Sequence, residues 1–327
     1  MYKPPFDITS NMLKMSISIT EKLGQIVSFN SLKRMPILRR NNKIKSIHSS
    51  LAIEANSLSL NQVKDVIEGK VVIGQQKEIQ EVKNAYKVYN MFKEFDCYYE
   101  ADLLKAHGIL MSQLEQETGM YRNHGEGVFD GTKVIFVAPP HELVPTLMKD
   151  LFTWVKQDDE TPLLIKSCVF HYEFVFIHPF GDGNGRIARL WQNLLLSKWN
   201  PIFEYIPVES QIKKYQSTYY EKIALCHSNG NSNAFIEFML QMINDTLDDI
   251  LISVKKESKN ISDQVNKLLE VMEVDIPYSA NELMKYLKIK TKETLRSSYL
   301  NPAIENGLVK MSLPDKPNSK NQRYIKV

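Results

Sequence analysis

Cysteine is scarce in this sequence, and the few that occur form no pattern. Only three are present among 327 residues, at positions 97, 168 and 226, and no two of them make a CxxC pair. A secreted domain held by disulfides normally carries an even set of cysteines at regular spacing. The sequence therefore argues against a disulfide framework and favours a reducing compartment.

Long apolar runs and a strong charge imbalance are also missing. No uninterrupted apolar stretch is long enough to cross a bilayer, and the first residues, MYKPPFDITS, lack the basic and apolar regions of a signal peptide. The net charge of +3 is too small to indicate nucleic-acid binding by itself. We therefore expect a cytoplasmic protein that makes no membrane contact.

Glycine and proline are sparse as well, with 13 and 14 copies in the whole chain, which favours long regular elements. Leu, Ile, Met, Lys and Glu recur at three- and four-residue spacing, as is typical of amphipathic helices. One segment differs, because GVFDGTKVIFV (residues 127–137) places DG between two β-prone runs and predicts a hairpin. The expected fold class is mostly α, with a short β-hairpin.

Changes in composition along the chain indicate four regions. We expect an N-terminal helical region over 1–100, a compact helical core over 101–245, a polar linker helix over 246–262 and a C-terminal domain over 263–327. In the last of these, Ser279 and Glu282 form a capping box, and two short β-prone runs follow a second helix. Helix, turn, helix and a two-stranded wing is the winged-helix pattern, and a small helical packing module is the alternative.

Glycine and positive charge gather in one stretch, HPFGDGNGRIAR, directly before the apolar helix pattern LWQNLLLSKW. A helix N-terminus carries unsatisfied N–H groups and a partial positive charge. Gly183 and Gly185 flank Asn184 there, and glycine allows both close approach of the backbone and the positive φ of an anion nest. The pattern predicts an anion site at the start of this helix.

The charged residues of the same stretch indicate which anion is bound. Arg186 and Arg189 are three residues apart, so both fall on the polar side of the helix, where paired hydrogen bonds can hold a polyphosphate. Asp182 would repel phosphate unless a cation such as Mg²⁺ lies between them. His178 can accept a proton near neutral pH. We infer a metal-bound nucleoside triphosphate and a nucleophile deprotonated by His178; a tight turn with solvated arginines is the alternative.

These residues resemble a known family. HPFGDGNGRIAR matches every defined position of HxFx(D/E)GNGRxxR, the signature of the Fic (Fido) family. FHYEFVFIHPF is similar to the helix before the signature, GMYRNH and KVIFVAPP are similar to the flap, and the C-terminal region is similar to a winged-helix domain often fused to such proteins. The resemblance implies a helical Fic-fold core that transfers AMP from Mg²⁺-bound ATP to a hydroxyl side chain (Ser, Thr or Tyr) of a target protein, the protein itself included, with release of pyrophosphate.

The resemblance also implies a role for each matching residue. His178 would take the proton of the target hydroxyl, Asp182 would hold Mg²⁺, and Arg189 would bind the γ-phosphate. The remaining positions form three groups: Gly183, Asn184, Gly185 and Arg186 at the phosphates, the flap residues Lys133, Val134, Ile135 and Phe136 at the docked target strand, and Tyr219 and Tyr220 near the nucleoside. Just upstream of the tyrosines, Tyr215 and Gln216 replace the family's usual Asn-Arg, which is a departure in this part of the pocket.

The stretch SSLAIEANSLSL resembles the inhibitory motif of the family, (S/T)xxxE(G/N). Ser50 and Glu54 match, whereas Ala55 departs from the final Gly or Asn. A helix presenting the Glu54 carboxylate to Arg189 would form a paired, largely buried salt bridge where the γ-phosphate belongs, and breaking such a pair typically costs ~3–5 kcal/mol. In relatives this glutamate is also linked to removal of AMP. A solvated helix residue is the alternative for Glu54.

Two rival functions stay open. One is transfer of another nucleotide or phosphate-containing group, and the other is a DNA-binding regulator with a nucleotide-sensing core. The basic residues that support the second are Lys285, Lys288, Lys290, Lys292 and Arg296. Protein contacts of the winged helix and a homodimer are also compatible with the sequence. Among the histidines, we expect His171 to be a core residue and His107, His124, His141 and His227 to lie on the surface or in loops.

Overall fold

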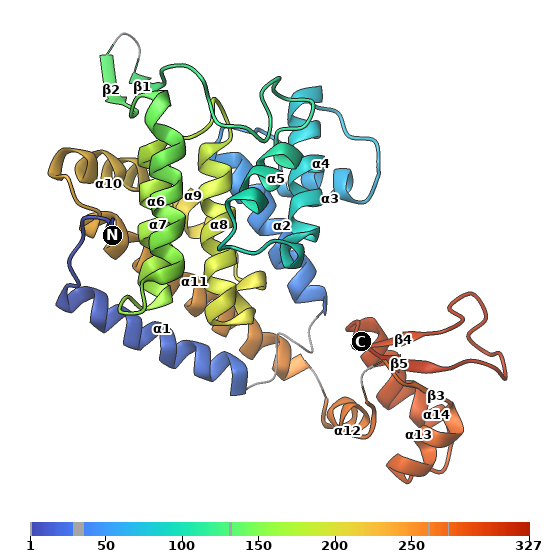
Figure 1. The fold of residues 1–327 in the computed structure, drawn as a ribbon. Helices are drawn as coiled ribbons and strands as arrows, with labels where there is room; N and C mark the ends of the chain where they lie inside the picture. The colour runs from blue at the N-terminus through green and yellow to red at the C-terminus, as the bar shows by residue number, and fades with distance from the viewer. Residues whose placement is uncertain (1, 29–35, 131–132, 261, 274) are drawn as a thin grey trace. The chain divides into compact units, whose positions relative to one another are not determined.

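The computed structural model describes residues 2–28, 36–130, 133–260, 262–273 and 275–327, and these are mostly helical (Figure 1). Two small antiparallel sheets complete the described part, one of two strands and one of three. This confirms the expected fold class of a mostly α chain with a short hairpin. No described helix combines the length and the apolar character that crossing a membrane requires.

The described chain divides into two compact units. The first joins the residues up to Glu21 with Asn42–Leu247, and the second joins Lys22–Asn41 with Asp248–Val327. Helix α11 (Asn233–Asn260) runs without a break past residue 245, where the sequence predicted the core to end. The boundaries expected near residues 100, 245 and 262 stay predictions.

The helices and the hairpin that build the site lie in the first unit, except for the last residues of α1 and the first residues of α2, which fall in the second. Their bounds are α1 (Ser10–Ser28), α2 (Pro36–Ile53), α3 (Leu60–Ile67), α4 (Gln76–Asn90), α5 (Glu100–Leu110), β1 (Gly127–Asp130), β2 (Lys133–Val137), α6 (Val144–Gln157), α7 (Leu163–Ile177), α8 (Asn184–Trp199), α9 (Val208–Lys214) and α10 (Gln216–Asn229).

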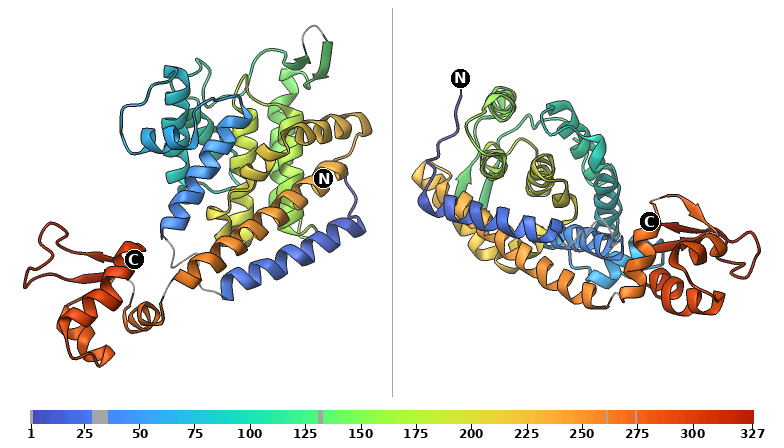
Figure 2. Two further views of the ribbon diagram at one scale, coloured as in Figure 1. Left: turned by 180° about the vertical axis from the view of Figure 1, so that it is seen from behind. Right: turned by 90° about the horizontal axis from the view of Figure 1, so that it is seen from below.

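Helices α7 and α8 form the centre of this unit and lie side by side (Figures 1 and 2). Helix α7 is apolar around nearly its whole circumference, and Leu164–Phe174 are all buried, as expected for a helix surrounded by others. On α8, the Trp191 side chain is fully buried and its Nε1 donates to the Cys97 carbonyl at 3.1 Å. The loop that joins the two helices, residues 178–183, therefore rests on a rigid base.

Helix α2 is anchored to this centre by a buried carboxylate on α9. The Glu209 side chain accepts hydrogen bonds from Ser46 of α2 at 2.9 Å, Tyr89 of α4 at 3.0 Å and Asn193 of α8 at 2.7 Å. Burial raises the pKa of this carboxyl above its usual range, although these hydrogen bonds oppose the shift. A further bond joins Asn42 of α2 to the Tyr205 carbonyl at 3.1 Å. These contacts fix the position of the C-terminal end of α2.

The predicted hairpin is present. Strands β1 and β2 pair antiparallel, with Gly127 opposite Val137 and Val128 opposite Phe136, and a register shift follows Val128. The bond from the Ala138 N–H to the Glu126 carbonyl, at 3.0 Å, closes the base of the hairpin. Two prolines and the 3-10 helix η2 (His141–Leu143) lead from the hairpin to α6.

The C-terminal part of the second unit has its own core, which includes Leu283, Leu295 and Tyr324. The predicted capping box is formed, because Ser279 Oγ accepts from the Glu282 N–H and the Glu282 carboxylate accepts from the Ser279 N–H. The sheet has three strands instead of the expected two, in the order β3-β5-β4, because the residues before α13 add an edge strand. The bounds are α12 (Asp263–Val271), β3 (Pro277–Tyr278), α13 (Ala280–Leu287), α14 (Lys292–Thr294), the π-helical turn η4 (Leu295–Leu300), α15 (Asn301–Glu305), β4 (Val309–Met311) and β5 (Tyr324–Lys326).

Candidate active site

His178 ends helix α7 in the left-handed conformation, with φ 50° and ψ 59°. Its N–H still donates to the Phe174 carbonyl at 3.0 Å, so the chain leaves the helix sharply after this bond. One ring nitrogen is hydrogen-bonded to the Val175 main chain, and burial is the main reason why the pKa of this imidazole lies below its ordinary value of 6.5. His178 is therefore largely neutral near pH 7, and the second ring nitrogen keeps a lone pair that can accept a proton.

The glycine-rich loop is closed by the side chain of Asn184. Asn184 Oδ1 accepts from the Phe180 N–H at 3.0 Å, and its Nδ2 donates to the Phe180 carbonyl at 2.7 Å. The side chain thus serves the loop itself, and only the main chain of Asn184 is left to face an anion. Gly183 has a φ of 83°, and a Cβ there would lie 2.8 Å from Met111 Sδ. Glycine is therefore required at this turn for both conformation and space.

Asp182 and Arg186 are joined across the start of α8. Arg186 Nη2 donates to Asp182 Oδ1 at 2.8 Å, and the Gly183 N–H donates to the same oxygen. Burial would raise the pKa of Asp182, but Arg186 and this N–H outweigh it and keep the pKa below the usual value. Glu81 of α4 lies 3.7 Å from Arg186 Nη1, while the buried Nε of Arg186 has no hydrogen-bond partner. Arg186 therefore retains one buried donor for a further acceptor.

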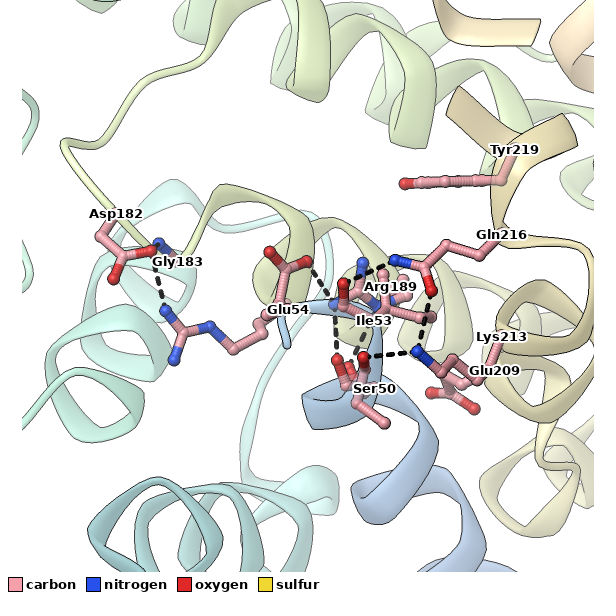
Figure 3. A network of polar contacts seen from close by, with 12 residues as sticks. Ser50, Ile53, Glu54, Asp182, Gly183, Arg189, Glu209, Lys213, Gln216 and Tyr219 are labelled. Atoms are coloured by element: carbon pink, nitrogen blue, oxygen red, sulfur yellow. Dashed lines mark hydrogen bonds and ion pairs between the residues drawn. The ribbon is translucent and has the colours of Figure 1, made fainter. Parts of the chain in front are cut away.

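Arg189 is held by the end of helix α2. Its side chain is 1% exposed; Nε donates to Ser50 Oγ at 3.0 Å, and Nη2 donates both to the Ser50 carbonyl at 2.9 Å and to Glu54 Oε1 at 2.8 Å (Figure 3). Burial would lower the pKa of this guanidinium, but Glu54 reverses the effect and the pKa is raised. A Cβ at Gly185 would collide with Glu54 Oε1, so the carboxylate lies directly against the start of α8. Glu54 thus lies at the place where the glycine pattern predicts an anion site.

The ion pair differs in two respects from the sequence-based expectation. Glu54 lies in the turn after α2 and not inside the helix, and its side chain is 32% exposed, so only the arginine is deeply buried. The expected pairing of both carboxylate oxygens is replaced by one short contact, because Ser50 occupies two other donor positions of Arg189. Ala55 has a φ of 66°, the left-handed conformation that favours Gly or Asn. This explains why the resembling motif ends in Gly or Asn and why Ala55 is strained.

Two side chains cap the C-terminal carbonyl groups of α2, which have no partners within the helix. Lys213 Nζ donates to the Ala52 carbonyl at 2.7 Å, and Gln216 Nε2 donates to the Ile53 carbonyl at 2.9 Å (Figure 3). Lys213 and Gln216 also bond to each other at 2.8 Å. A positive charge at this end is favoured by the helix dipole. The turn that carries Glu54 is thus held from α9 and α10 as well as from α8.

The two tyrosines of α10 differ in environment. Tyr219 is 2% exposed and its hydroxyl is 2.9 Å from His171 Nε2, while His171 Nδ1 lies 2.5 Å from Gln192 Oε1. His171 is thus the core residue that the sequence predicted. Tyr220 is 46% exposed, and its hydroxyl is 3.5 Å from the Ile53 carbonyl. Of the pair, Tyr220 is the one with open surface beside the end of α2, and Tyr219 supports it from inside.

The hairpin reaches the site through Phe136. Its ring stacks on His227 of α10 with a centroid distance of 4.0 Å and also contacts Phe176 of α7 at 5.6 Å. His227 lies on α10 and is half-buried, and its Nε2 is buried within this aromatic group with no hydrogen-bond partner among the described residues. The side chains of the other three flap positions, Lys133, Val134 and Ile135, lie outside the described part of the structure.

His107 is the clearest residue that the sequence analysis misplaced. It is 1% exposed, stacks on Phe180 at 3.7 Å, accepts from the Gly119 N–H through Nδ1 at 2.9 Å and contacts the Asp182 carbonyl through Nε2 at 3.0 Å. Because Nδ1 accepts, the proton is on Nε2, and burial lowers the pKa to about 4. The His107 side chain therefore supports the loop by contacting the loop's main chain. No metal-like spacing marks it in the sequence, and main-chain contacts leave no motif of their own.

Asp182 is suited to share a divalent cation with phosphate oxygens. One of its oxygens accepts from Arg186 and Gly183, the other accepts no hydrogen bond from the described residues, and the side chain is 40% exposed. Among the described residues no group of three or more His, Cys, Asp or Glu side chains could hold a metal. The single carboxylate of Asp182 fits Mg²⁺, which commonly takes one or two carboxylates and completes its shell with phosphate oxygens and water.

Two family models match the chain. The model of the Fic/DOC family matches residues 95–196, and the model described as "Filamentation induced by cAMP protein Fic-like, C-terminal domain" matches residues 263–325. The first range contains the hairpin, α7, the loop at His178 and most of α8. The second covers nearly all of the helices and strands that follow α11.

Curated relatives and solved structures agree with this match. "Protein adenylyltransferase fic-1" of Caenorhabditis elegans is 26% identical over 78% of this chain and 49% of its own length, and "Protein adenylyltransferase Fic" of Culex quinquefasciatus is 28% identical over 63% and 41%. The chain thus spans about half the length, or less, of the curated relatives it matches.

Among solved structures, Fic-1 (residues 134–508) from C. elegans has a TM-score of 0.60 at 23% identity, over 75% of this chain and 73% of that one, which shows a shared fold. A Fic family protein from Desulfovibrio desulfuricans G20 has a TM-score of 0.75 and is 41% identical, covering 100% of this chain and 98% of that one. With identity of this size over its whole length, the chain belongs to the Fic family.

Proposed function

We propose that this protein transfers AMP from Mg²⁺-bound ATP to a hydroxyl group of a protein, and that Glu54 inhibits the transfer. The observation that carries the proposal is the place of the Glu54 carboxylate, against the first turn of α8 and on the buried guanidinium of Arg189. A site that holds a carboxylate in this way is built for an anion. The names of the curated relatives favour adenylyl transfer over the other group transfers and over the DNA-binding alternative.

In the proposed reaction, the triphosphate lies along the start of α8. The free main-chain N–H groups of its first turn, the unpartnered Nε of Arg186 and the guanidinium of Arg189 would bind the phosphate oxygens. Asp182 would hold Mg²⁺, which neutralises phosphate charge when bound. His178 would take the proton of the target hydroxyl. The target oxygen then bonds to the α-phosphorus, the bond to the β-phosphate oxygen breaks, and pyrophosphate leaves.

The target is proposed to dock beside the hairpin. The edge of a two-stranded sheet has unpaired N–H and C=O groups, which an extended segment of another protein can complete. A Ser, Thr or Tyr hydroxyl on that segment would reach His178, and the protein's own side chains are candidate targets too. For the C-terminal unit we retain the winged-helix assignment, with its exposed basic residues as a contact surface for protein or DNA.

The central prediction concerns Glu54 and His178. Glu54→Gly should raise AMP labelling of the protein by its own activity about ten- to a hundredfold. Only the arginine of the ion pair is deeply buried, so we expect the pair to contribute about 1.4–2.8 kcal/mol, which is less than a fully buried pair contributes. His178→Ala in the same background should abolish the labelling. The measurement is radiolabel or adenylate mass on the protein after incubation with Mg²⁺ and ATP. Unchanged labelling in both variants would refute the proposal.

A second prediction concerns pH. Transfer requires neutral His178, and burial places the pKa of this residue below 6.5, so activity should be retained at pH 6.5 and fall only as the pH drops further. Glu54 raises the pKa of His178 slightly, so the acid limb in Glu54→Gly should lie lower still. Initial rates between pH 4.5 and 8 test this. A half-maximal rate above pH 6.5 would show that His178 is not the base.

A third prediction uses the strain at Ala55. Ala55→Gly relieves a left-handed conformation that costs roughly 1 kcal/mol, so the protein should melt at a higher temperature and basal AMP labelling should fall about threefold. Ala52→Gly is the matched control, because the same change inside helix α2 costs about 1 kcal/mol and should raise the labelling. If labelling changes in the same direction in both variants, the stability of this helix end does not control the inhibition.

A fourth prediction concerns the cap on α2. Lys213→Ala removes the donor to the Ala52 carbonyl and should raise labelling about three- to tenfold, because the turn that carries Glu54 is less well held. Lys214→Ala, which changes the exposed neighbouring lysine, should leave it unchanged. Adding Lys213→Ala to Glu54→Gly should bring no further increase. A full additional increase in the double variant would place Lys213 in the reaction itself and not in inhibition.

A further inference from the structure

Arg122 is a buried arginine whose guanidinium binds only main-chain carbonyl groups among the described residues. It is 3% exposed, and it precedes the hairpin by a few residues. Arginine this deep is normally paired with a carboxylate, because an unpaired buried charge is costly. Here the acceptors come from two separate segments, the loop at His178 and the two ends of the hairpin.

The first set of contacts holds the His178 loop. Arg122 Nε donates to the His178 carbonyl at 2.7 Å, and its main-chain N–H donates to the Pro179 carbonyl at 2.9 Å. A longer contact of 3.4 Å runs from Nη2 to the Ile177 carbonyl. The left-handed conformation of His178 is unfavourable for a residue other than glycine, and these bonds to its carbonyl and its neighbours stabilise it.

The second set of contacts holds the hairpin. Arg122 Nη1 donates to the His124 carbonyl at 2.7 Å, on the entering side, and Nη2 donates to the Pro139 carbonyl at 2.6 Å, on the leaving side. One guanidinium therefore joins both ends of the hairpin to the carbonyl of His178. The donors of a guanidinium point in fixed directions in one plane. Arg122 therefore sets the relative position of the His178 loop and the two ends of the hairpin, which a lysine ammonium could not do.

We propose that Arg122 is a positioning residue that fixes the hairpin relative to His178 and thereby sets the distance between a docked target hydroxyl and the imidazole. The first half of the proposal rests on the contacts of Arg122 alone. The second half rests on the proposed function, because it assumes that the target docks at the hairpin. ATP binds at the other side of the loop, at the start of α8, and is expected to be unaffected.

The experiment compares Arg122→Lys with the unaltered chain and with Asn123→Ala, an exposed neighbour in the same loop. Amide hydrogen exchange measured by mass spectrometry tests the clamp without any need for activity. In Arg122→Lys, peptides over 124–139 and 177–180 should exchange at least tenfold faster, while α7 and α8 keep their protection. Asn123→Ala should exchange like the unaltered chain. Unchanged exchange of the hairpin in Arg122→Lys overturns the clamp, whatever the protein's activity.

The catalytic half is tested in the Glu54→Gly background, at a temperature well below the melting point measured for each variant. Arg122→Lys should lower the rate of AMP transfer to protein at least tenfold, while the Kd of an ATP analogue with Mg²⁺ changes less than threefold. A purely structural arginine would give the full rate under these conditions, and that result overturns the positioning role. Absence of transfer in the Glu54→Gly parent itself would refute the proposed function and leave the exchange result standing.

A measurement on the unaltered chain replaces the variant if Arg122→Lys fails to fold. One clamp should release both segments together, so the amides of Arg122 and Ala138, whose bonds run to Pro179 and Glu126, should exchange with the same opening free energy. Two clearly different opening free energies overturn the proposal.

Discussion

The site depends on the burial of one guanidinium. Arg189 lies under 2% exposed within the helical centre, and a cation at that depth must have anionic or carbonyl partners close by. In this structure the partners are the hydroxyl and carbonyl of Ser50 and the carboxylate of Glu54. Since Ser50 is part of α2, the last turns of that helix must stay near α8, and the bond from Ser46 of α2 to Glu209 of α9 helps to hold them there.

Three helix ends contribute to the site, and each has a different backbone requirement that its own helix does not satisfy. The end of α7 needs a left-handed residue, which His178 supplies, and the start of α8 has free N–H groups facing the same space. The end of α2 has carbonyl groups without partners inside the helix, and those of Ala52 and Ile53 accept from Lys213 and Gln216. Helix termini thus provide the polar groups of the site, while the apolar faces of α7 and α8 provide its rigidity.

How far the sequence predicts this arrangement depends on how each contact is made. The loop and the two arginines follow from side chains whose charges and spacing are visible in the sequence, and the Glu54 contact follows from the resemblance to the inhibitory motif of the family. His107, Arg122 and Lys213 act on main-chain carbonyl groups, which every residue has, so no pattern distinguishes them from surface residues. Main-chain contacts also define the third strand beside the expected wing. Pro277–Tyr278 is too short to be predicted as a strand, and it becomes one by pairing with Tyr324–Lys326.

One contact next to the inhibitory turn links the two arginines of α8. Asn56, two residues after Glu54, donates to Glu81 at 2.7 Å, and the other oxygen of Glu81 faces Arg186 at 3.7 Å. The segment whose Glu54 pairs with Arg189 therefore also holds the acid that lies beside Arg186. In the proposed reaction, an arriving triphosphate would displace both acids, and the release of one would free the segment for the release of the other. The two contacts should consequently open together in one all-or-none step, while the fraction of open molecules still rises hyperbolically with the concentration of the single ligand.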